Sequence, residues 1–310
     1  MNSREWRYFL KVAELGNVTR AAAQLHLTQP ALSRHLKQLE EEAGTPLLAR
    51  HGRGVRLTAA GVHFRDVARE ILGRLVSLQD ELRASTDEPT GELAVGMPLS
   101  WSGLITSQLI PRFLRLYPRV RIHITEGTTM DLRRALKARQ LHLAVLTEVE
   151  RDSELTLAKL AVEGACMIGP KSAGLSPTKA LDLKQVAKQP LIMLPHTTRI
   201  RYQLERVLAK ARVDANTIIE VNTLLLMKFV EAGMGFTILP ACAIAGSPAK
   251  DRLSYTNIQG FESHWGLATV KRRPRSAAVN AFEAETRALL RELIEGGKWP
   301  SARLTTEKGL

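Results

Sequence analysis

The sequence predicts an α/β protein with a mainly helical N-terminal part, one long connecting helix, and a C-terminal part that alternates strands with helices. Three observations support this prediction. Apolar residues recur at helical spacing from residue 4 to about residue 86. Residues 87–91 then break the pattern with a proline and a glycine, and short apolar runs alternate with helical patterns beyond them. At 310 residues, the chain is long enough for two or three domains.

The N-terminal part divides into three short helices, a basic loop and a long helix. The first helix ends at Gly16, the second covers residues 19–25, and the third begins at Thr28 and is closed by Gly44. A basic loop with two glycines follows, which is typical of a hairpin or wing, and a periodic helix then starts at Thr58. We therefore expect a domain over residues 1–58, a linker helix over 59–86 and a hinge over 87–91.

The C-terminal part shows a βαβαβ order that predicts a parallel sheet. Its expected strands cover residues 93–97, 120–125 and 143–146, with helices at 104–116 and 130–138 between them. A second series places strands at 166–169, 191–194, 218–221, 236–239 and 266–270, helices at 202–211 and 224–232, and a closing helix at about 277–294.

Residues 21–37 have the spacing of a helix-turn-helix, with small alanines where two helices approach and leucines in the angle between them. Thr28 can cap the second of these helices. The outward face of that helix presents Gln29, Ser33, Arg34 and Lys37, whose side chains can hydrogen-bond base edges or phosphates in the major groove. The alternative is a small helical core whose outer face is only solvated.

The charge balance indicates a polyanionic partner. The chain has 44 Lys and Arg against 31 Asp and Glu, a net charge of +13, which suggests nucleic acid before an anionic metabolite or membrane surface. A generally basic protein is the alternative. Residues 1–90 contribute only +2 of this excess. The argument for DNA therefore depends on local residues: Arg50, Arg53 and Arg56 flank two glycines, where the backbone can approach phosphates closely.

Other classes of function have little support. The eight histidines are scattered and no nucleophile elbow or phosphate-binding loop is present, so we expect no catalytic residues and no enzyme. Cys166 and Cys242 lack neighbours at metal spacing, so neither a metal site nor a disulfide framework is expected. The absence of a long apolar run and the charged N-terminus argue against a membrane span and export. We expect a cytoplasmic protein.

In these motifs, and over nearly its whole length, the chain resembles the LysR-type transcriptional regulators of bacteria. The residues that carry the resemblance lie at 9–34, 39–41, 44–48, 50 and 57–61, and then at 91–96, 116–120 and 230–240. The resemblance implies that Gln29, Pro30, Ser33 and Arg34 contact double-stranded DNA and that Arg53 lies in the wing. It also implies a homodimer formed through the linker helix, with a homotetramer and RNA polymerase as further expected partners.

The same resemblance implies a periplasmic-binding-protein-like effector domain over residues 92–300. Its first lobe would take residues 92–163 and 266–300, and its second lobe residues 164–265. Residues 301–310 would be a flexible tail. No cofactor is expected. A small-molecule effector would lie in the cleft, near the carboxyl ends of strands and the N-termini of helices.

Polar residues follow the predicted strands at these junctions. They are Ser100, Trp101, Ser102, Thr128, Thr129, Thr147, Thr197, Thr198, Arg199 and Thr223. Each alone is readily explained as a helix cap, but several junctions that converge on one cleft favour ligand binding. Arg199 is a candidate partner for a carboxylate or similar anion, with a solvated surface arginine as the alternative. Residues 146–150 hold no basic residue, so relatives with a cation there are poor guides.

These observations predict a LysR-type regulator that binds promoter DNA through a winged helix-turn-helix and senses a small, anionic metabolite. The competing hypothesis is a two-lobe solute-binding protein or enzyme with a basic helical appendage. The identity of the effector, the operator, the sign of regulation, and the choice between dimer and tetramer stay open at this point.

Overall fold

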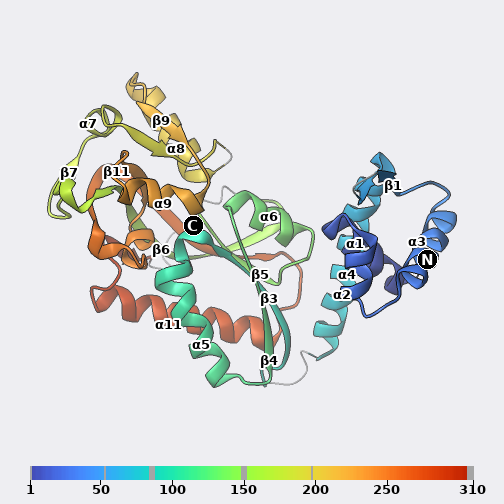
Figure 1. The fold of residues 1–310 in the computed structure, drawn as a ribbon. Coiled ribbons are helices and arrows are strands. Elements are labelled where there is room, and N and C mark those ends of the chain that lie inside the picture. The colour runs from blue at the N-terminus through green and yellow to red at the C-terminus, as the bar shows by residue number, and fades with distance from the viewer. Residues whose placement is uncertain (1, 52–53, 84–87, 148–151, 197, 306–310) are drawn as a thin grey trace. The chain divides into compact units, whose positions relative to one another are not determined.

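The computed structural model describes residues 2–51, 54–83, 88–147, 152–196 and 198–305. The chain forms two compact units (Figure 1). The first comprises residues 1–82 with 138–140, and the second comprises residues 83–137 with 141–310. The domain and lobe boundaries expected from the sequence stay predictions, apart from the tail discussed below.

The first unit contains three short helices, a two-stranded hairpin and a long helix, as the sequence predicts. These elements are α1 (Ser3–Leu15), α2 (Val18–Gln24), α3 (Gln29–Ala43), β1 (Leu48–His51), β2 (Gly54–Leu57) and α4 (Ala59–Arg83). Local chemistry sets the helix ends. Asn2 and Glu5 form a capping box at the start of α1, and Gly16 ends that helix in the left-handed conformation, with φ of 60°.

The core of the first unit brings α1, α2, α3 and the start of α4 together. Phe9, Leu32 and Leu39 are almost completely buried. The ring of Phe64, on α4, makes edge-on contacts with Phe9 and Trp6, at centroid distances of 5.2 and 5.8 Å. These aromatic contacts fix the first turns of the long helix against the helix-turn-helix.

Hydrogen bonds from the hairpin backbone hold the hairpin against α3 and the end of α1. Glu40, on α3, accepts hydrogen bonds from the backbone N–H groups of Leu47 and Leu48, at 2.7 and 2.8 Å. Gly54 has φ of 145°, and a Cβ atom there would lie 2.4 Å from the carbonyl oxygen of Gly16. Glycine is therefore required where the hairpin passes the end of α1.

The second unit contains an eight-stranded sheet in which six strands have the order β10-β6-β11-β5-β3-β4. The strands β3 (Gly91–Pro98), β4 (Val120–Gly127) and β5 (Leu143–Thr147) are parallel, which confirms the prediction from the βαβαβ order. The strands β6 (Leu155–Pro170) and β11 (Leu253–Val270) are long and antiparallel to each other. The remaining strands of this sheet are β7 (Ala180–Leu181), β10 (Thr237–Pro240) and β12 (Ala302–Leu304). A separate parallel pair consists of β8 (Leu191–Met193) and β9 (Thr217–Glu220).

The two long strands connect two lobes. The sequence predicts only their more continuously apolar segments, residues 166–169 and 266–270. Charged residues such as Lys159 and Glu163 interrupt the apolar pattern in the rest of β6. Between Asn257 and Glu262 the pairing of β11 with β6 shifts register. This irregularity marks a bend in the crossing strands.

The helices pack on the sheet in two groups. In the first lobe they are α5 (Ser107–Leu116), preceded by 3-10 and π-helical turns over residues 99–106, then α6 (Thr129–Lys137) and α11 (Ala277–Glu295). In the second lobe they are α7 (Leu183–Ala187), α8 (Arg199–Ala211), α9 (Thr223–Glu231) and α10 (Ala241–Ala245), with short 3-10 turns at Lys171–Ala173 and Lys250–Arg252. Helices α5 and α11 lie side by side (Figure 1). Arg112 on α5 forms ion pairs with Glu285 and Glu292 on α11.

The expectation of a flexible tail from residue 301 onward is wrong for residues 302–304. They form β12, which pairs antiparallel with β6. The Trp299 side chain is buried and donates from Nε1 to Glu163 at 2.7 Å. A buried indole with a hydrogen-bonded N–H anchors the chain just before the strand, a contact that the polar composition of the last residues does not reveal. Residues 306–310 lie outside the described part.

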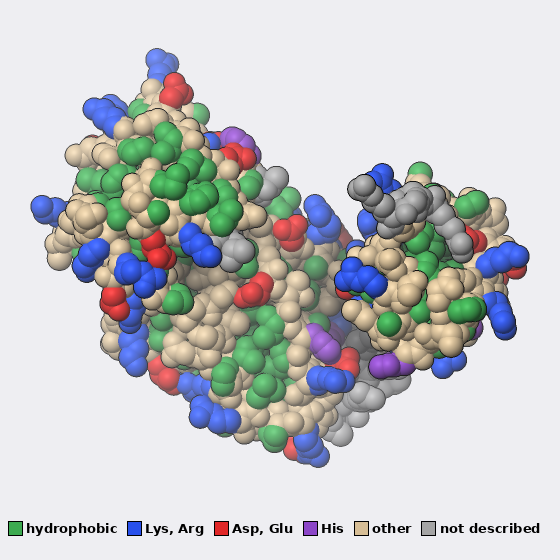
Figure 2. Space-filling view, in the orientation of Figure 1, with side chains coloured by type: hydrophobic (Ala, Val, Ile, Leu, Met, Phe, Trp, Pro, Cys, Tyr) green, Lys and Arg blue, Asp and Glu red, His purple; other side chains and the backbone are tan. Residues whose placement is uncertain are grey.

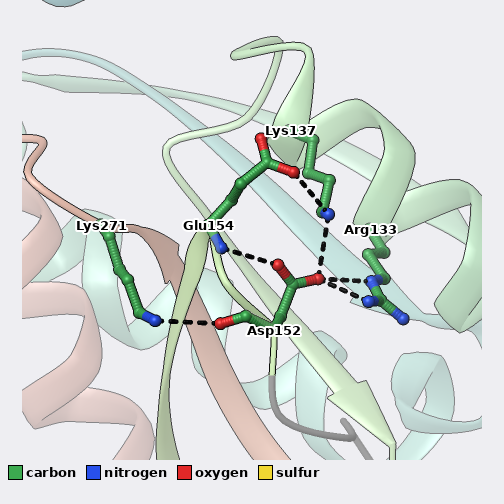
Figure 3. Close-up of polar contacts among 5 residues, drawn as sticks. All are labelled: Arg133, Lys137, Asp152, Glu154 and Lys271. Atoms are coloured by element: carbon green, nitrogen blue, oxygen red, sulfur yellow. Dashed lines mark hydrogen bonds and ion pairs between the residues drawn. The ribbon is translucent and has the colours of Figure 1, made fainter.

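A group of ion pairs joins α6 to the segment that follows β5 (Figure 3). The buried Asp152 carboxylate accepts from Arg133 Nε at 2.9 Å and lies 3.1 Å from Lys137 Nζ. Lys137 also bonds Glu154, while Lys271 Nζ donates to the Asp152 carbonyl oxygen at 3.0 Å. Burial alone would raise the pKa of Asp152, but the Glu154 backbone N–H and the two cations hold that pKa well below its usual range.

Candidate functional site

The start of α3 presents polar side chains to solvent. Thr28 accepts from the Ala31 backbone N–H at 3.4 Å and thereby caps the helix, and Pro30 lies in its first turn. Gln29 and Arg34 are exposed. Gln29 Nε2 donates to Ser33 Oγ at 3.0 Å, which orients the amide along the helix face. Lys37 is exposed and lies 3.5 Å from Glu41.

These side chains share a groove with the hairpin. The groove has a volume of about 400 Å³, and Pro30, Ser33, Arg34 and Lys37 line it together with hairpin residues that include Leu48 and Val55. Arg56 is exposed on β2. Arg50 lies in β1 but its side chain is outside the described part, as is the whole of Arg53. The structure thus brings four of the predicted DNA-binding residues to one concave surface.

A second concave site lies in the second unit, between its two lobes. This cleft has a volume of about 510 Å³. Seven of the ten residues predicted to bind an effector line it: Ser100, Ser102, Thr128, Thr129, Thr147, Thr198 and Arg199. The convergence follows from the parallel arrangement of β3, β4 and β5, because parallel strands end at the same edge of a sheet.

Hydroxyl groups dominate the first-lobe wall of the cleft. Ser102 Oγ donates to Glu126 Oε1, and Thr128 Oγ1 donates to Asp131 Oδ2 at 2.7 Å. The Thr129 and Thr147 hydroxyls lie 2.8 Å apart, and the Thr147 backbone N–H also donates to Thr129 Oγ1. Internal hydrogen bonds therefore fix the side chains of this wall before any ligand arrives.

The second-lobe wall carries a cation. Arg199 begins α8 and lines the cleft, and among the described lining residues it is the charged one. Its Cζ atom lies 5.4 Å from the ring centroid of Tyr202, within the range of a cation–π contact. The adjacent Thr198 donates from Oγ1 to the Pro195 carbonyl oxygen at 2.8 Å. A guanidinium at the first turn of a helix suits an anionic group of a ligand.

Three predicted effector residues are not placed at the cleft. The Trp101 side chain is fully buried in the core of the first lobe, where its ring lies 5.3 Å from that of Trp265, so the prediction that it faces a ligand is wrong. A large apolar ring after a strand gains more from the core than from a hydrated cleft. Thr197 and the side chain of Thr223 lie outside the described part.

Several lining residues were missed by sequence reasoning. They include Leu99, Gln203, Met227, Leu239, Ser247, Ser263 and Trp265. Most lie within helices or in the middle of a long strand, where residues that face a cleft have the same periodicity as residues that face a core. Only contact across the lobes distinguishes them.

Glu163 lies directly beside the cleft-lining Trp265 and is completely buried. Its carboxylate accepts four hydrogen bonds: from Trp265 Nε1 at 2.5 Å, Trp299 Nε1 at 2.7 Å, the Cys242 backbone N–H at 2.8 Å and Cys242 Sγ at 3.1 Å. Burial raises the pKa of Glu163, while these donors oppose the rise. Strands β6 and β11, helix α10 and the segment before β12 therefore meet at one carboxylate.

Both cysteines are buried thiols. Burial and the neighbouring Glu163 raise the pKa of Cys166 to about 12 and that of Cys242 well above its ordinary value. A thiol held in this way is a poor nucleophile. Among the described residues, no group of three or more His, Cys, Asp or Glu side chains could hold a metal ion. None of the described helices combines the length and the apolar composition of a membrane span.

Comparisons with known proteins match both units. A family model described as "Bacterial regulatory helix-turn-helix protein, lysR family" matches residues 3–62, and one described as "LysR substrate binding domain" matches residues 86–291. The chain is 30% identical over 245 residues to the nitrogen assimilation regulatory protein nac of Klebsiella aerogenes, covering 78% of this chain and 79% of that protein. It is 26% identical over 295 residues to the HTH-type transcriptional regulator BbuR of Bordetella bronchiseptica, covering 94% and 91%.

Solved structures show the same fold. A crystal structure of full-length CbnR complexed with its target DNA has a TM-score of 0.69 and 23% identity, covering 93% of this chain and 100% of that one. A full-length OxyR variant from Pseudomonas aeruginosa has a TM-score of 0.70 and 22% identity, covering 100% and 99%. BbuR is named as a transcriptional regulator and nac as a regulatory protein. The chain therefore belongs to the LysR family of bacterial transcriptional regulators.

Proposed function

We propose that the first unit binds promoter DNA through Gln29, Pro30, Ser33 and Arg34, with Lys37 and the hairpin arginines on flanking phosphates. The observation that carries this proposal is the exposed, capped start of α3 beside the hairpin. Gln29 and Arg34 have the amide and guanidinium groups that pair with adenine and guanine edges. Arg50 lies on β1 and Arg56 on β2, and the sequence between these strands adds Arg53, so this basic stretch is suited to phosphate contacts.

The second unit, in this proposal, senses a small molecule with a carboxylate or similar anionic group. The supporting observation is the cleft, with Arg199 on one wall and fixed hydroxyls on the other. Its apolar lining residues, such as Leu99, Met227 and Leu239, would cover the body of the molecule. A ligand held by both lobes stabilises one relative arrangement of the lobes over others.

Self-association follows from an apolar stripe on α4, which we define as Val67, Ile71 and Leu75. These side chains are 37–43% exposed, and they recur every four residues on one face of the helix. Burial of such a stripe against the same helix of a second copy would form a dimer, which suits a near-palindromic DNA site. Two dimers would form a tetramer that spans two sites. A regulator of this kind works at the nucleoid in the cytoplasm.

A salt-titrated gel-shift assay tests the DNA-binding part of the proposal. The full chain should retain binding to DNA from upstream of its own gene in excess competitor DNA, with an affinity that falls as salt rises. Binding that is equally strong to random DNA and vanishes at moderate salt would argue for a basic two-lobe binding protein instead. A thermal-shift screen of carboxylates tests the sensing part, because a ligand that binds the native state raises its melting temperature.

A further inference from the structure

The orientation of the hydroxyl groups in the cleft limits the chemistry of its ligand. A hydroxyl has one hydrogen to donate. Ser102 gives its hydrogen to Glu126, and Thr128 gives its hydrogen to Asp131. Ser102 and Thr128 both line the cleft. While these two bonds persist, their hydroxyl oxygens can act towards a ligand only as acceptors. At Ser102 and Thr128 the first-lobe wall therefore presents acceptors supported by two carboxylates, while the Thr129–Thr147 pair keeps one hydroxyl hydrogen.

The same reasoning applies on the other side of the cleft. Thr198 donates its hydroxyl hydrogen to the Pro195 carbonyl oxygen. Trp265, which pairs with Thr147 on the first-lobe side, donates its indole N–H to Glu163. What Trp265 offers to the cleft is thus the apolar part of its ring. Arg199 supplies guanidinium N–H donors and a positive charge on the second-lobe side. The cationic donor of the cleft thus belongs to the second lobe, and the two acceptors supported by carboxylates belong to the first.

We propose that the effector is an amino-carboxylate with an apolar side chain. This inference rests on the proposed function and narrows the ligand class of the same cleft. The ligand carboxylate binds Arg199, and its ammonium group donates to Ser102 and Thr128 under the attraction of Glu126 and Asp131. A plain carboxylate satisfies Arg199 but brings neither a donor to the Ser102 and Thr128 hydroxyls nor a positive charge to the carboxylates behind them.

The geometry also explains how such a ligand would act on both lobes. Ser102, Thr128 and their carboxylate partners belong to the first lobe, whereas Arg199 begins α8 of the second. A molecule with one charge of each sign at its polar end would connect the two walls. A singly charged ligand would be held strongly by one lobe only.

Matched sets of three ligands test the inference on the full chain. Each set contains an amino acid, its deaminated acid and its decarboxylated amine: L-leucine with 4-methylpentanoate and isopentylamine, and L-phenylalanine with 3-phenylpropanoate and phenethylamine. Thermal shifts and calorimetry should show that at least one amino acid binds about tenfold or more tightly than both of its counterparts. An acid that binds as tightly as its amino acid, or no binding by either amino acid at millimolar concentration, overturns the inference. If an acid binds as tightly as its amino acid, the proposed sensing of anions still stands. If neither amino acid binds, the separate carboxylate screen decides whether the cleft senses anions.

Variants of the acceptor wall give an independent readout. Glu126→Gln removes the charge beside Ser102 at an exposed position, so the fold should be retained. It should lower affinity for the amino acid about tenfold and leave affinity for the deaminated acid nearly unchanged. Glu92→Gln, at the opposite end of β3 from the cleft-lining Pro98, is the control and should change neither affinity. Equal affinities for the amino acid in wild type and Glu126→Gln would contradict the proposal.

Discussion

Trp265 Nε1 donates a hydrogen bond of 2.5 Å to Oε1 of Glu163, and the same tryptophan lines the cleft between the lobes. Glu163 lies on the long strand β6 and Trp265 on its partner β11, so this bond joins the two strands that cross between the lobes. Trp299 and Cys242 bind the same carboxylate from the C-terminal segment and from α10. One buried side chain thus holds both the tryptophan that lines the cleft and the two strands that cross between the lobes.

Replacement of Glu163 by glutamine should destabilise the second unit. The glutamine amide keeps the shape but has one acceptor oxygen, so its NH₂ group would face donors such as the Trp299 indole or the Cys242 backbone N–H. Loss of these bonds in a fully buried site should lower the free energy of unfolding by about 2–4 kcal/mol. Urea denaturation followed by tryptophan fluorescence measures the change. A variant as stable as the wild type would show that the four bonds contribute little.

The two thiols should be inert in the native chain. Burial and the Glu163 carboxylate raise the pKa of both Cys166 and Cys242, so almost no thiolate is present at neutral pH. A colorimetric thiol reagent should therefore modify them only slowly at pH 7.5, and both should react at once in denaturant. Rapid modification of either cysteine in the folded chain would refute this assignment.

Asp152 should contribute to stability in a pH-dependent way. Its folded-state pKa is lowered below the unfolded value near 4, so its contribution is complete above that value and is lost as the pH falls towards the folded pKa. Asp152→Asn should cost about 1–3 kcal/mol at pH 7, and the difference from wild type should shrink between about pH 5 and pH 2. Denaturation curves over this pH range test the sign. Ser153→Ala, at the neighbouring exposed residue, serves as control.

The α4 apolar stripe should mediate self-association. Ile71→Glu places a charge in the stripe and should convert the assembly to smaller species in light-scattering or sedimentation measurements. Val62→Glu is a matched control, because Val62 is also exposed but lies nine residues away, on the opposite face of the helix. Both variants add a charge to α4. If only Ile71→Glu lowers the mass of the assembly, the stripe mediates self-association. The same mass for wild type and Ile71→Glu would count against it.

A further exposed apolar surface lies on the second lobe. Figure 2 shows apolar side chains gathered over the region of α8 and β9, where Tyr202 and Ile218 are each nearly half exposed. Clusters of this kind on a soluble unit often mark a contact with another chain.

Much of the architecture could be predicted from the sequence because local patterns determine it. The caps at Thr28 and Gly16 set helix ends. At residues 87–91 the helical spacing of apolar residues gives way to short apolar runs, and this change separates the two parts of the sequence. The first-lobe wall of the cleft could also be predicted from the sequence, because Ser102, Thr128 and Thr147 follow parallel strands that end at one edge of the sheet. Patterns of this type act within a few residues of the side chain that they place.

Features that depend on distant residues could not be predicted. The ring of Trp101 follows a strand just as the cleft hydroxyls do, and only its contacts with Trp265 and Trp299 show that it belongs to the core. Glu163 gave no signal, because its donors come from positions 79 to 136 residues away in the sequence. For the same reason, the sequence predicts only the apolar segments of the two long crossing strands.

In the proposed function, the start of α3 reads the DNA sequence. The most direct measurement compares wild type with the double variant Ser33→Ala, Arg34→Ala in a competition gel shift with DNA from upstream of the gene. The variant should lose about 10- to 1,000-fold of its preference for that DNA over random DNA, while Arg121→Ala, at an exposed position on β4, should keep it. An unchanged preference in a double variant that remains folded would show that the start of α3 does not select the DNA sequence.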